Sequence, residues 1–179
     1  MNKSLLLASA LLIVGCGTPA SYKDPNGRDL VVSLEKVNIQ DFATAGSAML
    51  QSMVQSKAFD RKEAPVLQLG QILNDTTNNF DTSLLLSKIT MPLVNAGRIQ
   101  LIESDPMAAA ARVATPGAKV PTPEFVLKGK ILEDRANAGG TRQASYIFQL
   151  TLVDVRTSLA VWAKEETVTK AGSKNSVGF

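Results

Sequence analysis

The chain has 179 residues, a formal net charge of +3 at pH 7, one cysteine and no histidine. These absences exclude zinc fingers, histidine metal sites, Ser-His-Asp and Cys-His catalysis, and an internal disulfide. The small net charge, with no basic run interleaved with aromatic residues, argues against nucleic acid as a partner. The length corresponds to one domain and is sufficient to bury a hydrophobic core.

Residues 1–15 have the pattern of a secretory signal peptide. The apolar run of residues 5–14 is too short to span a bilayer, which takes about 20 apolar residues. The run ends in Ile13-Val14-Gly15-Cys16, which resembles a bacterial lipobox. The resemblance implies cleavage before Cys16 and acylation, palmitate included, of its thiol and new amino group. The alternative is an ordinary signal peptide that contains a cysteine. Gly17 favours the outer membrane, because an aspartate there would suggest retention in the inner membrane.

Residues 16–37 are expected to form the lipidated N-terminus and a short tether. They begin polar and carry the turn signals Pro19, Pro25 and Asn26-Gly27. A globular domain is predicted over residues 38–172, followed by a loose tail over 173–179.

Two amphipathic helices are predicted, over residues 40–57 and from Asp81 or Thr82 to Ala96. Their apolar stripes are Phe42, Ala45, Met49 and Met53, and Leu85, Ile89, Leu93 and Ala96. Asp41 suits the first turn of the first helix, and Gly97 suits the position just after the second. Pro92 predicts a kink or break over residues 88–92, because proline cannot donate the helical hydrogen bond.

Strands are predicted over residues 66–73 and 99–103. The first is apolar at both parities, which predicts a central strand covered on both faces. A short alanine-rich helix over 107–113 and a proline-rich loop over 115–124 follow.

Three β segments are predicted at the end of the domain, over residues 125–134, 145–155 and 159–170. The second has the cleanest alternation, with Tyr146, Phe148, Leu150 and Leu152 on one face. Residues 135–144, with Gly139-Gly140, are expected to form a long hairpin loop. The polar second half of the last segment is expected to run past the sheet, and Trp162 is expected in the core. The fold class is α+β: a single mixed sheet of about four to five strands, with an antiparallel C-terminal meander, flanked by helices.

Three candidate chemical motifs do not assemble. Ser33-Leu34-Glu35-Lys36 matches the S-x-x-K of β-lactamases, but Lys170-Ala171-Gly172 precedes Ser173-Lys174-Asn175 where the order should be reversed. The glycines of residues 138–141 lack the rest of a phosphate-binding loop. Asp75 and Asp81 lack the spacing of a calcium loop. The sequence therefore predicts a protein that is not an enzyme and that has no metal or cofactor.

Three stretches resemble, in their order and spacing, the LpoB-type activators of penicillin-binding proteins. The first is the helix over residues 46–53. The second runs from Pro65-Val66-Leu67 through Asn74-Asp75-Thr76-Thr77 and Phe80-Asp81-Thr82 to Gly97-Arg98-Ile99. The third combines Leu127-Lys128-Gly129-Lys130-Ile131 with residues 150–154 and Val161-Trp162. The resemblance covers residues 40–170 and implies a small sheet flanked by helices, related to the TolB N-terminal and CsgG-like domains.

The resemblance implies a non-catalytic outer-membrane lipoprotein, facing the periplasm, that binds and stimulates a bifunctional peptidoglycan synthase, a class A penicillin-binding protein. Such an activator is expected to be a monomer in one-to-one contact with its partner. Arg135 and Arg142, which flank the glycines of the hairpin, are candidate contact residues, with solvation of the loop as the alternative. A CsgG-like accessory lipoprotein in outer-membrane assembly or secretion is the alternative function. Enteric members of the family carry a long tether, whereas the tether here is short.

Overall fold

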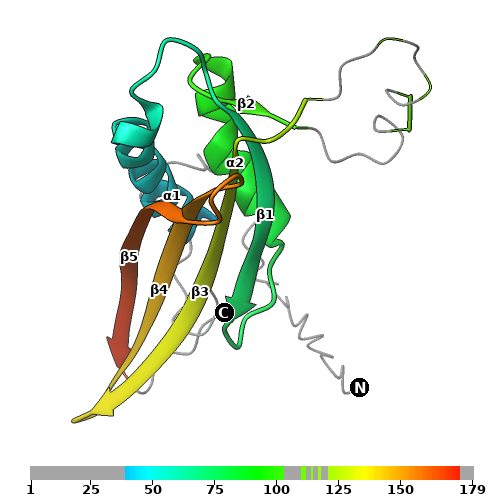
Figure 1. The fold of residues 1–179 in the computed structure, drawn as a ribbon. Coiled ribbons are helices and arrows are strands. Elements are labelled where there is room, and N and C mark those ends of the chain that lie inside the picture. The colour runs from blue at the N-terminus through cyan, green and yellow to red at the C-terminus, as the bar shows by residue number, and fades with distance from the viewer. Residues whose placement is uncertain (1–38, 103–109, 112–113, 115–116, 118–120, 174–179) are drawn as a thin grey trace, which may run out of the picture. The chain divides into compact units, whose positions relative to one another are not determined.

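The computed structural model describes residues 39–102, 110–111, 114, 117 and 121–173. The chain divides into two units, residues 1–30 and 31–179, and everything described here belongs to the second. Its elements follow the chain in this order (Figure 1): α1 (Ile39–Val54), a 3-10 turn η1 (Lys57–Phe59), β1 (Val66–Asp75), α2 (Thr82–Asn95), β2 (Gln100–Leu101), β3 (Phe125–Ala138), β4 (Thr141–Asp154) and β5 (Ala160–Ser173).

The five strands form one mixed sheet in the order β2-β1-β3-β4-β5. β1 is parallel to both β2 and β3, whereas β3, β4 and β5 form an antiparallel meander. The α+β class and the single sheet with a C-terminal meander, predicted from the sequence, are therefore confirmed.

Both helices pack on the same face of the sheet (Figure 1). The side chains that alternate along β4 meet the apolar stripes of the helices there, and the ring of Phe42 packs edge-on against Tyr146 and Phe148. Burial of these large apolar side chains supplies the main driving force for the fold. The fully buried members of this core include Phe42, Met49, Leu50, Met53, Leu67, Leu85, Leu127, Ile131, Tyr146, Phe148, Leu150 and Leu152.

Helix α2 is stabilised at both ends by its own sequence. Asp81 is the N-cap and accepts hydrogen bonds from the backbone N–H groups of Ser83 and Leu84, at 2.8 and 3.1 Å. At the other end Gly97 has a φ of 64°, and the Arg98 N–H donates to the Leu93 carbonyl at 2.9 Å, which closes the helix.

Of the kink or break expected over residues 88–92, a break does not occur, because α2 is continuous from Thr82 to Asn95. Pro92 lies in the last turn, where the loss of one backbone hydrogen bond disturbs little of the helix. Of the predicted stripe, Leu85 and Ile89 are buried, Leu93 is half-buried and Ala96 is exposed.

The long loop expected over residues 135–144 is instead a tight hairpin. β3 and β4 remain paired as far as Ala138 and Thr141, so only Gly139 and Gly140 turn the chain. Their φ angles of 54° and 87° are both positive, as a type I′ hairpin turn requires. The prediction failed because backbone pairing continues after the apolar alternation has ended.

The predictions for β1 and β5 also need correction. β1 is internal in the sheet but covered on one face only, since Gln68 is exposed and Leu73 is 53% exposed. β5 does not run past the sheet, because it pairs with β4 as far as Ser173. Trp162 is half-buried and packs against the core without being enclosed in it. The predictions for residues 1–38 and 174–179, and most of those for 103–120, lie outside the described residues.

Candidate functional site

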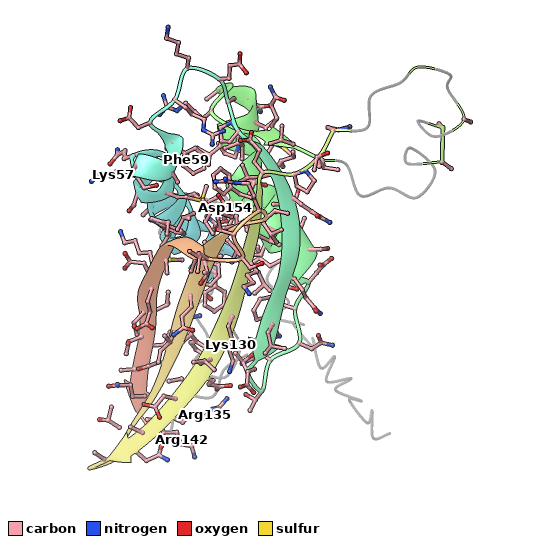
Figure 2. The ribbon with its side chains drawn as sticks, viewed as in Figure 1. Lys57, Phe59, Lys130, Arg135, Arg142 and Asp154 are labelled. Carbon is pink, nitrogen blue, oxygen red and sulfur yellow. The ribbon has the colours of Figure 1, made fainter. Side chains whose placement is uncertain are left out.

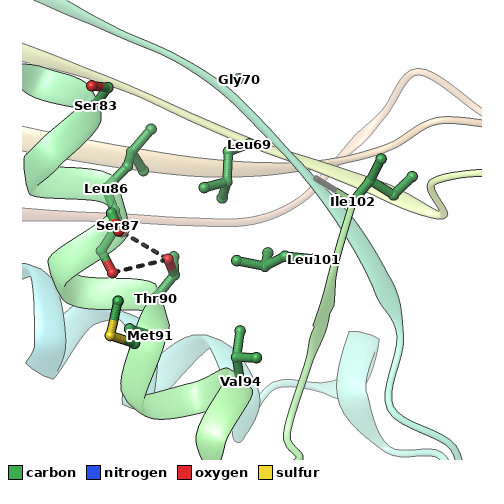
Figure 3. Close-up of a pocket in the computed structure, with 10 residues that line it drawn as sticks. All are labelled: Leu69, Gly70, Ser83, Leu86, Ser87, Thr90, Met91, Val94, Leu101 and Ile102. Atoms are coloured by element: carbon green, nitrogen blue, oxygen red, sulfur yellow. Dashed lines mark hydrogen bonds between the residues drawn. The ribbon is translucent and has the colours of Figure 1, made fainter. Parts of the chain in front are cut away.

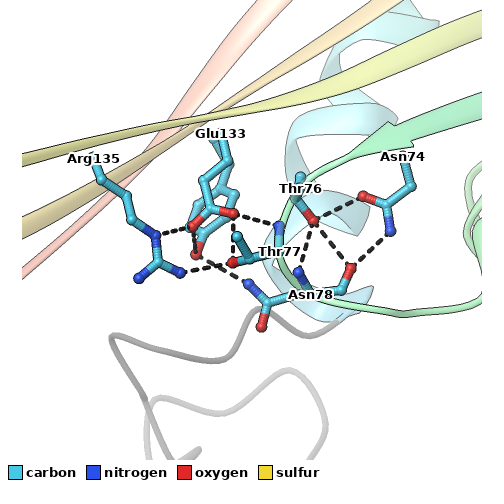
Figure 4. Close-up of polar contacts among 7 residues, drawn as sticks. Asn74, Thr76, Thr77, Asn78, Glu133 and Arg135 are labelled. Atoms are coloured by element: carbon cyan, nitrogen blue, oxygen red, sulfur yellow. Dashed lines mark hydrogen bonds and ion pairs between the residues drawn. The ribbon is translucent and has the colours of Figure 1, made fainter.

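A polar cluster joins the turn after β1 to the middle of β3 (Figure 4). We call it the Glu133 cluster; its members are Asn74, Thr76, Thr77, Asn78, Glu133, Arg135 and Tyr146. The Glu133 side chain is only 5% exposed. Its carboxylate accepts hydrogen bonds from the Thr77 N–H at 2.6 Å and from the Thr77 hydroxyl at 2.8 Å. The Arg135 Nε donates to the other carboxylate oxygen, and its guanidinium also donates to the Thr77 hydroxyl at 2.8 Å.

The remaining members of the Glu133 cluster hold the turn in place. The Asn74 amide donates to the Asn78 carbonyl at 2.8 Å, and the Thr76 hydroxyl donates to Asn74 Oδ1 at 2.8 Å. The Tyr146 hydroxyl donates to Glu133 at 3.4 Å. The Asn-Asp-Thr-Thr stretch on which the family resemblance partly rests is therefore a structural turn tied to β3.

The surroundings of Glu133 favour the charged form of its carboxyl group. Burial alone raises the pKa of Glu133, but the hydrogen bonds from Thr77 and the charge of Arg135 outweigh burial and bring the pKa below its ordinary value of 4.5. Burial also raises the pKa of Tyr146, and the neighbouring Glu133 charge adds to the effect. Neither group is tuned toward neutral pH, as a general acid or base would be.

Arg135 and Arg142, the candidate contact residues, are exposed and lie near the tip of the β3–β4 hairpin (Figure 2). Arg135 pairs in register with Ala144, and Arg142 with Asn137. Because side chains alternate along a strand, the two arginines are diagonal neighbours on the face that carries Tyr146. Arg135 donates to Glu133 and Thr77 in the Glu133 cluster, so part of its role is structural.

A groove of about 580 Å³ lies between α2 and the edge of the sheet (Figure 3). We call it the α2–β1 groove; its lining is Leu69, Gly70, Ser83, Leu86, Ser87, Thr90, Met91, Val94, Leu101 and Ile102. The Thr90 hydroxyl donates to the Leu86 carbonyl at 2.8 Å, so the buried polar group in its wall is already satisfied. Sequence reasoning missed this groove, because the exposed Met91 and Val94 lie outside the predicted stripe of α2.

The other motifs have structural roles or lie outside the described residues. Asp75 forms an ion pair with Lys130 at 3.4 Å, and Asp81 caps α2. Gly139 and Gly140 form the hairpin turn. Cys16 and the Ser33 motif are not among the described residues, within which no cluster of acidic, cysteine or histidine side chains could hold a metal ion. No helix in the same part of the chain is long and apolar enough to cross a membrane.

The described residues thus define a small α+β domain whose distinctive features are a surface groove, a basic hairpin tip and a structural polar cluster. The model of the family described as the peptidoglycan-synthase activator LpoB matches residues 41–116 and 107–168. These ranges make up more than half of the 179 residues, and the chain belongs to this family. No curated protein matches the chain.

Solved structures similar to this chain include members of the same family. The LpoB C-terminal domain from Salmonella enterica is 16% identical with a TM-score of 0.49, over 72% of this chain and 98% of that one. The C-terminal domain of Escherichia coli LpoB is also 16% identical with a TM-score of 0.49, over 73% and 99%. Lipoprotein GNA1162 from Neisseria meningitidis is 15% identical with a TM-score of 0.42, over 61% and 84%.

Proposed function

We propose that this protein is a lipid-anchored, non-catalytic activator that binds a bifunctional peptidoglycan synthase, a class A penicillin-binding protein, and raises its rate of glycan-strand synthesis. The family match across residues 41–168 carries the proposal. The lipobox-like Ile13-Val14-Gly15-Cys16 supports an anchor at Cys16, and Gly17 supports the outer membrane with the domain facing the periplasm. The activator is a monomer that contacts one synthase.

The hairpin tip is proposed as one contact. Arginine is enriched among the residues that contribute most to protein interfaces, because its guanidinium combines charge with five hydrogen-bond donors. Arg135 also donates to Glu133 and Thr77, so its substitution would disturb the Glu133 cluster as well as a contact with the synthase. A contact at the tip predicts an acidic or hydrogen-bond-accepting surface on the synthase.

The test is glycan-strand synthesis by the cognate synthase, measured with and without the purified full chain in detergent. A rate increase that saturates at one activator per synthase is expected. If the rate does not change and no complex forms at tens of micromolar, the activator function is rejected. The whole complex should also show a mass that corresponds to one copy of each protein.

The site assignment is tested separately with Arg142→Glu. We expect this change to weaken stimulation about tenfold, as loss of a central interface contact does. Arg156→Glu is the matched control, because Arg156 is an exposed arginine in the turn at the opposite end of β4. If both variants stimulate the synthase equally, the activator function stands, but the hairpin tip is not part of the contact surface.

A further inference from the structure

The α2–β1 groove runs beside an open strand edge. β2 is two residues long and pairs only with Val66 and Leu67 of β1. Just after β2, the Ile102 N–H donates a backbone hydrogen bond to the Leu67 carbonyl at 2.9 Å. Within the described part of the chain, no strand pairs with residues 68–75 of β1 on this side. An edge of this kind presents backbone donors and acceptors to an incoming strand.

The edge is irregular where it meets the groove. The register between β1 and β3 shifts between Leu69 and Ile72, which marks a bulge, and Gly70 at this bulge lines the groove. Bulges bend a strand and change the direction of its backbone groups, and they are common at sheet edges next to binding sites. The open backbone and the groove are therefore parts of one surface.

The lining of the groove determines the chemistry of its occupant. Among the residues that the structure describes, none that lines the groove is charged, although the chain has 19 lysines and arginines and 16 acidic residues. Met91 is 55% exposed and Val94 is 36% exposed, and Val94 lies on the side of α2 toward Leu101 in Figure 3. A charged side chain placed here would lose its hydration without gaining a partner. The complementary occupant is uncharged and apolar.

We propose that the α2–β1 groove binds an extended, uncharged segment of the synthase, which adds to the edge of β1 as an extra strand. Alternate apolar side chains of the segment enter the groove against Leu86, Met91 and Val94, while its backbone pairs with residues 68–75. Strand addition is an established mode of peptide recognition in which backbone hydrogen bonds give affinity and side-chain pockets give specificity. The inference rests on the proposed function, since it names the contact that the synthase makes.

An extended backbone fits this surface better than a helix or a small apolar molecule. A helix satisfies its own backbone groups and would leave the N–H and C=O groups along the edge of β1 covered but unpaired, which is costly. A small apolar molecule would fill the space and leave the same groups without partners. Only an added strand pairs with the backbone groups along the edge of β1 and also fills the groove with its side chains.

The test compares two glutamate substitutions on α2 in the whole lipoprotein, purified in detergent. Met91→Glu places a charge in the groove. Leu84→Glu is the matched control, because Leu84 lies on the same helix, is nearly as exposed (53% against 55% for Met91), and is not among the residues that line the groove. We expect Met91→Glu to raise the Kd for the synthase about tenfold or more, and Leu84→Glu to change it about twofold or less. Unchanged urea midpoints for both variants show that the fold is intact.

Hydrogen exchange distinguishes strand addition from other contacts. Amides within residues 68–75 should exchange about tenfold more slowly when the synthase is bound, because new backbone bonds protect them. If Met91→Glu binds as tightly as the wild type, the groove is not the contact. If it binds weakly but these amides are not protected, the groove accepts a side chain or a small molecule and the strand proposal is wrong. If the wild-type chain forms no complex at all, the proposed function fails, and this inference fails with it.

Discussion

At the scale of single residues, Glu133 carries the most specific electrostatic prediction. Its pKa lies below the ordinary value of 4.5 because the bonds from Thr77 and Arg135 outweigh burial. A carboxyl group whose pKa is lowered by folding contributes stability above its unfolded pKa, and the contribution is lost as the pH falls through the folded pKa. Glu133→Gln should therefore lower the free energy of unfolding at pH 7 by about 1.5–3 kcal/mol.

The difference between Glu133→Gln and wild type should begin to shrink as the pH falls below 4.5, where the unfolded wild-type chain takes up a proton, and should be lost as the pH falls through the lower pKa of the folded state. Urea unfolding at a series of pH values measures it. Asp134→Asn is the control, because Asp134 is the adjacent carboxyl group, is exposed, and lies on the opposite face of β3. A difference that stays constant from pH 7 to pH 3 would show that the Glu133 charge is not what stabilises the turn.

Trp162 gives a second prediction at this scale. The ring is half-buried and packs against the core from β5. Trp162→Ala should cost about 2 kcal/mol, less than the roughly 3–5 kcal/mol typical of a fully buried aromatic side chain. Phe148→Ala, which removes a ring with no exposed surface, should cost the larger amount. Equal shifts of the urea midpoint for the two variants would mean that Trp162 is as enclosed as Phe148.

At the scale of elements, the β3–β4 hairpin makes a prediction about its turn. Gly139 and Gly140 both have positive φ, and no atom lies within 4 Å of where a Cβ would be at either position. A side chain at either position therefore meets no steric clash, and its only cost is the strain of holding a residue with a Cβ at positive φ. Gly140→Ala should destabilise the domain by about 1–2 kcal/mol. Gly139→Asn should be nearly neutral, because asparagine followed by glycine suits this turn. Thermal unfolding of the two variants measures the difference, and equal melting temperatures would contradict it.

The elements also show which features of the fold can be predicted from the sequence. Both long helices and all five strands follow from local signals: the stripe from Phe42 to Met53, the Asp81 cap, and the alternation from Tyr146 to Leu152. The hairpin length does not, because residues beyond Ile131 carry no apolar alternation and are held by backbone pairing. The α2–β1 groove does not either, because it depends on where the two-residue strand β2 ends relative to α2. That is a matter of tertiary packing, which no local pattern encodes.

At the scale of the whole molecule, the proposed anchor and the proposed binding domain are expected to make separate contributions. The proposed tether of residues 16–37 spans at most about 70 Å when fully extended, and about 25 Å on average as a flexible coil. An anchor with a tether of this length holds the domain in a thin layer at the membrane and so raises its effective concentration for a partner within reach. None of the contacts with the synthase proposed above involves the proposed anchor.

This separation makes the last prediction a test with two readouts. Cys16→Ala should abolish incorporation of labelled fatty acid and release the protein from the membrane fraction, because Cys16 is the only cysteine in the chain. The same variant, once purified, should stimulate the synthase in solution as strongly as the wild type. Gly17→Asp is the control that keeps the lipid, and fractionation should move it from the outer to the inner membrane. Retained labelling in Cys16→Ala would disprove the anchor, whereas lost stimulation in solution would show that the lipidated end is part of the contact.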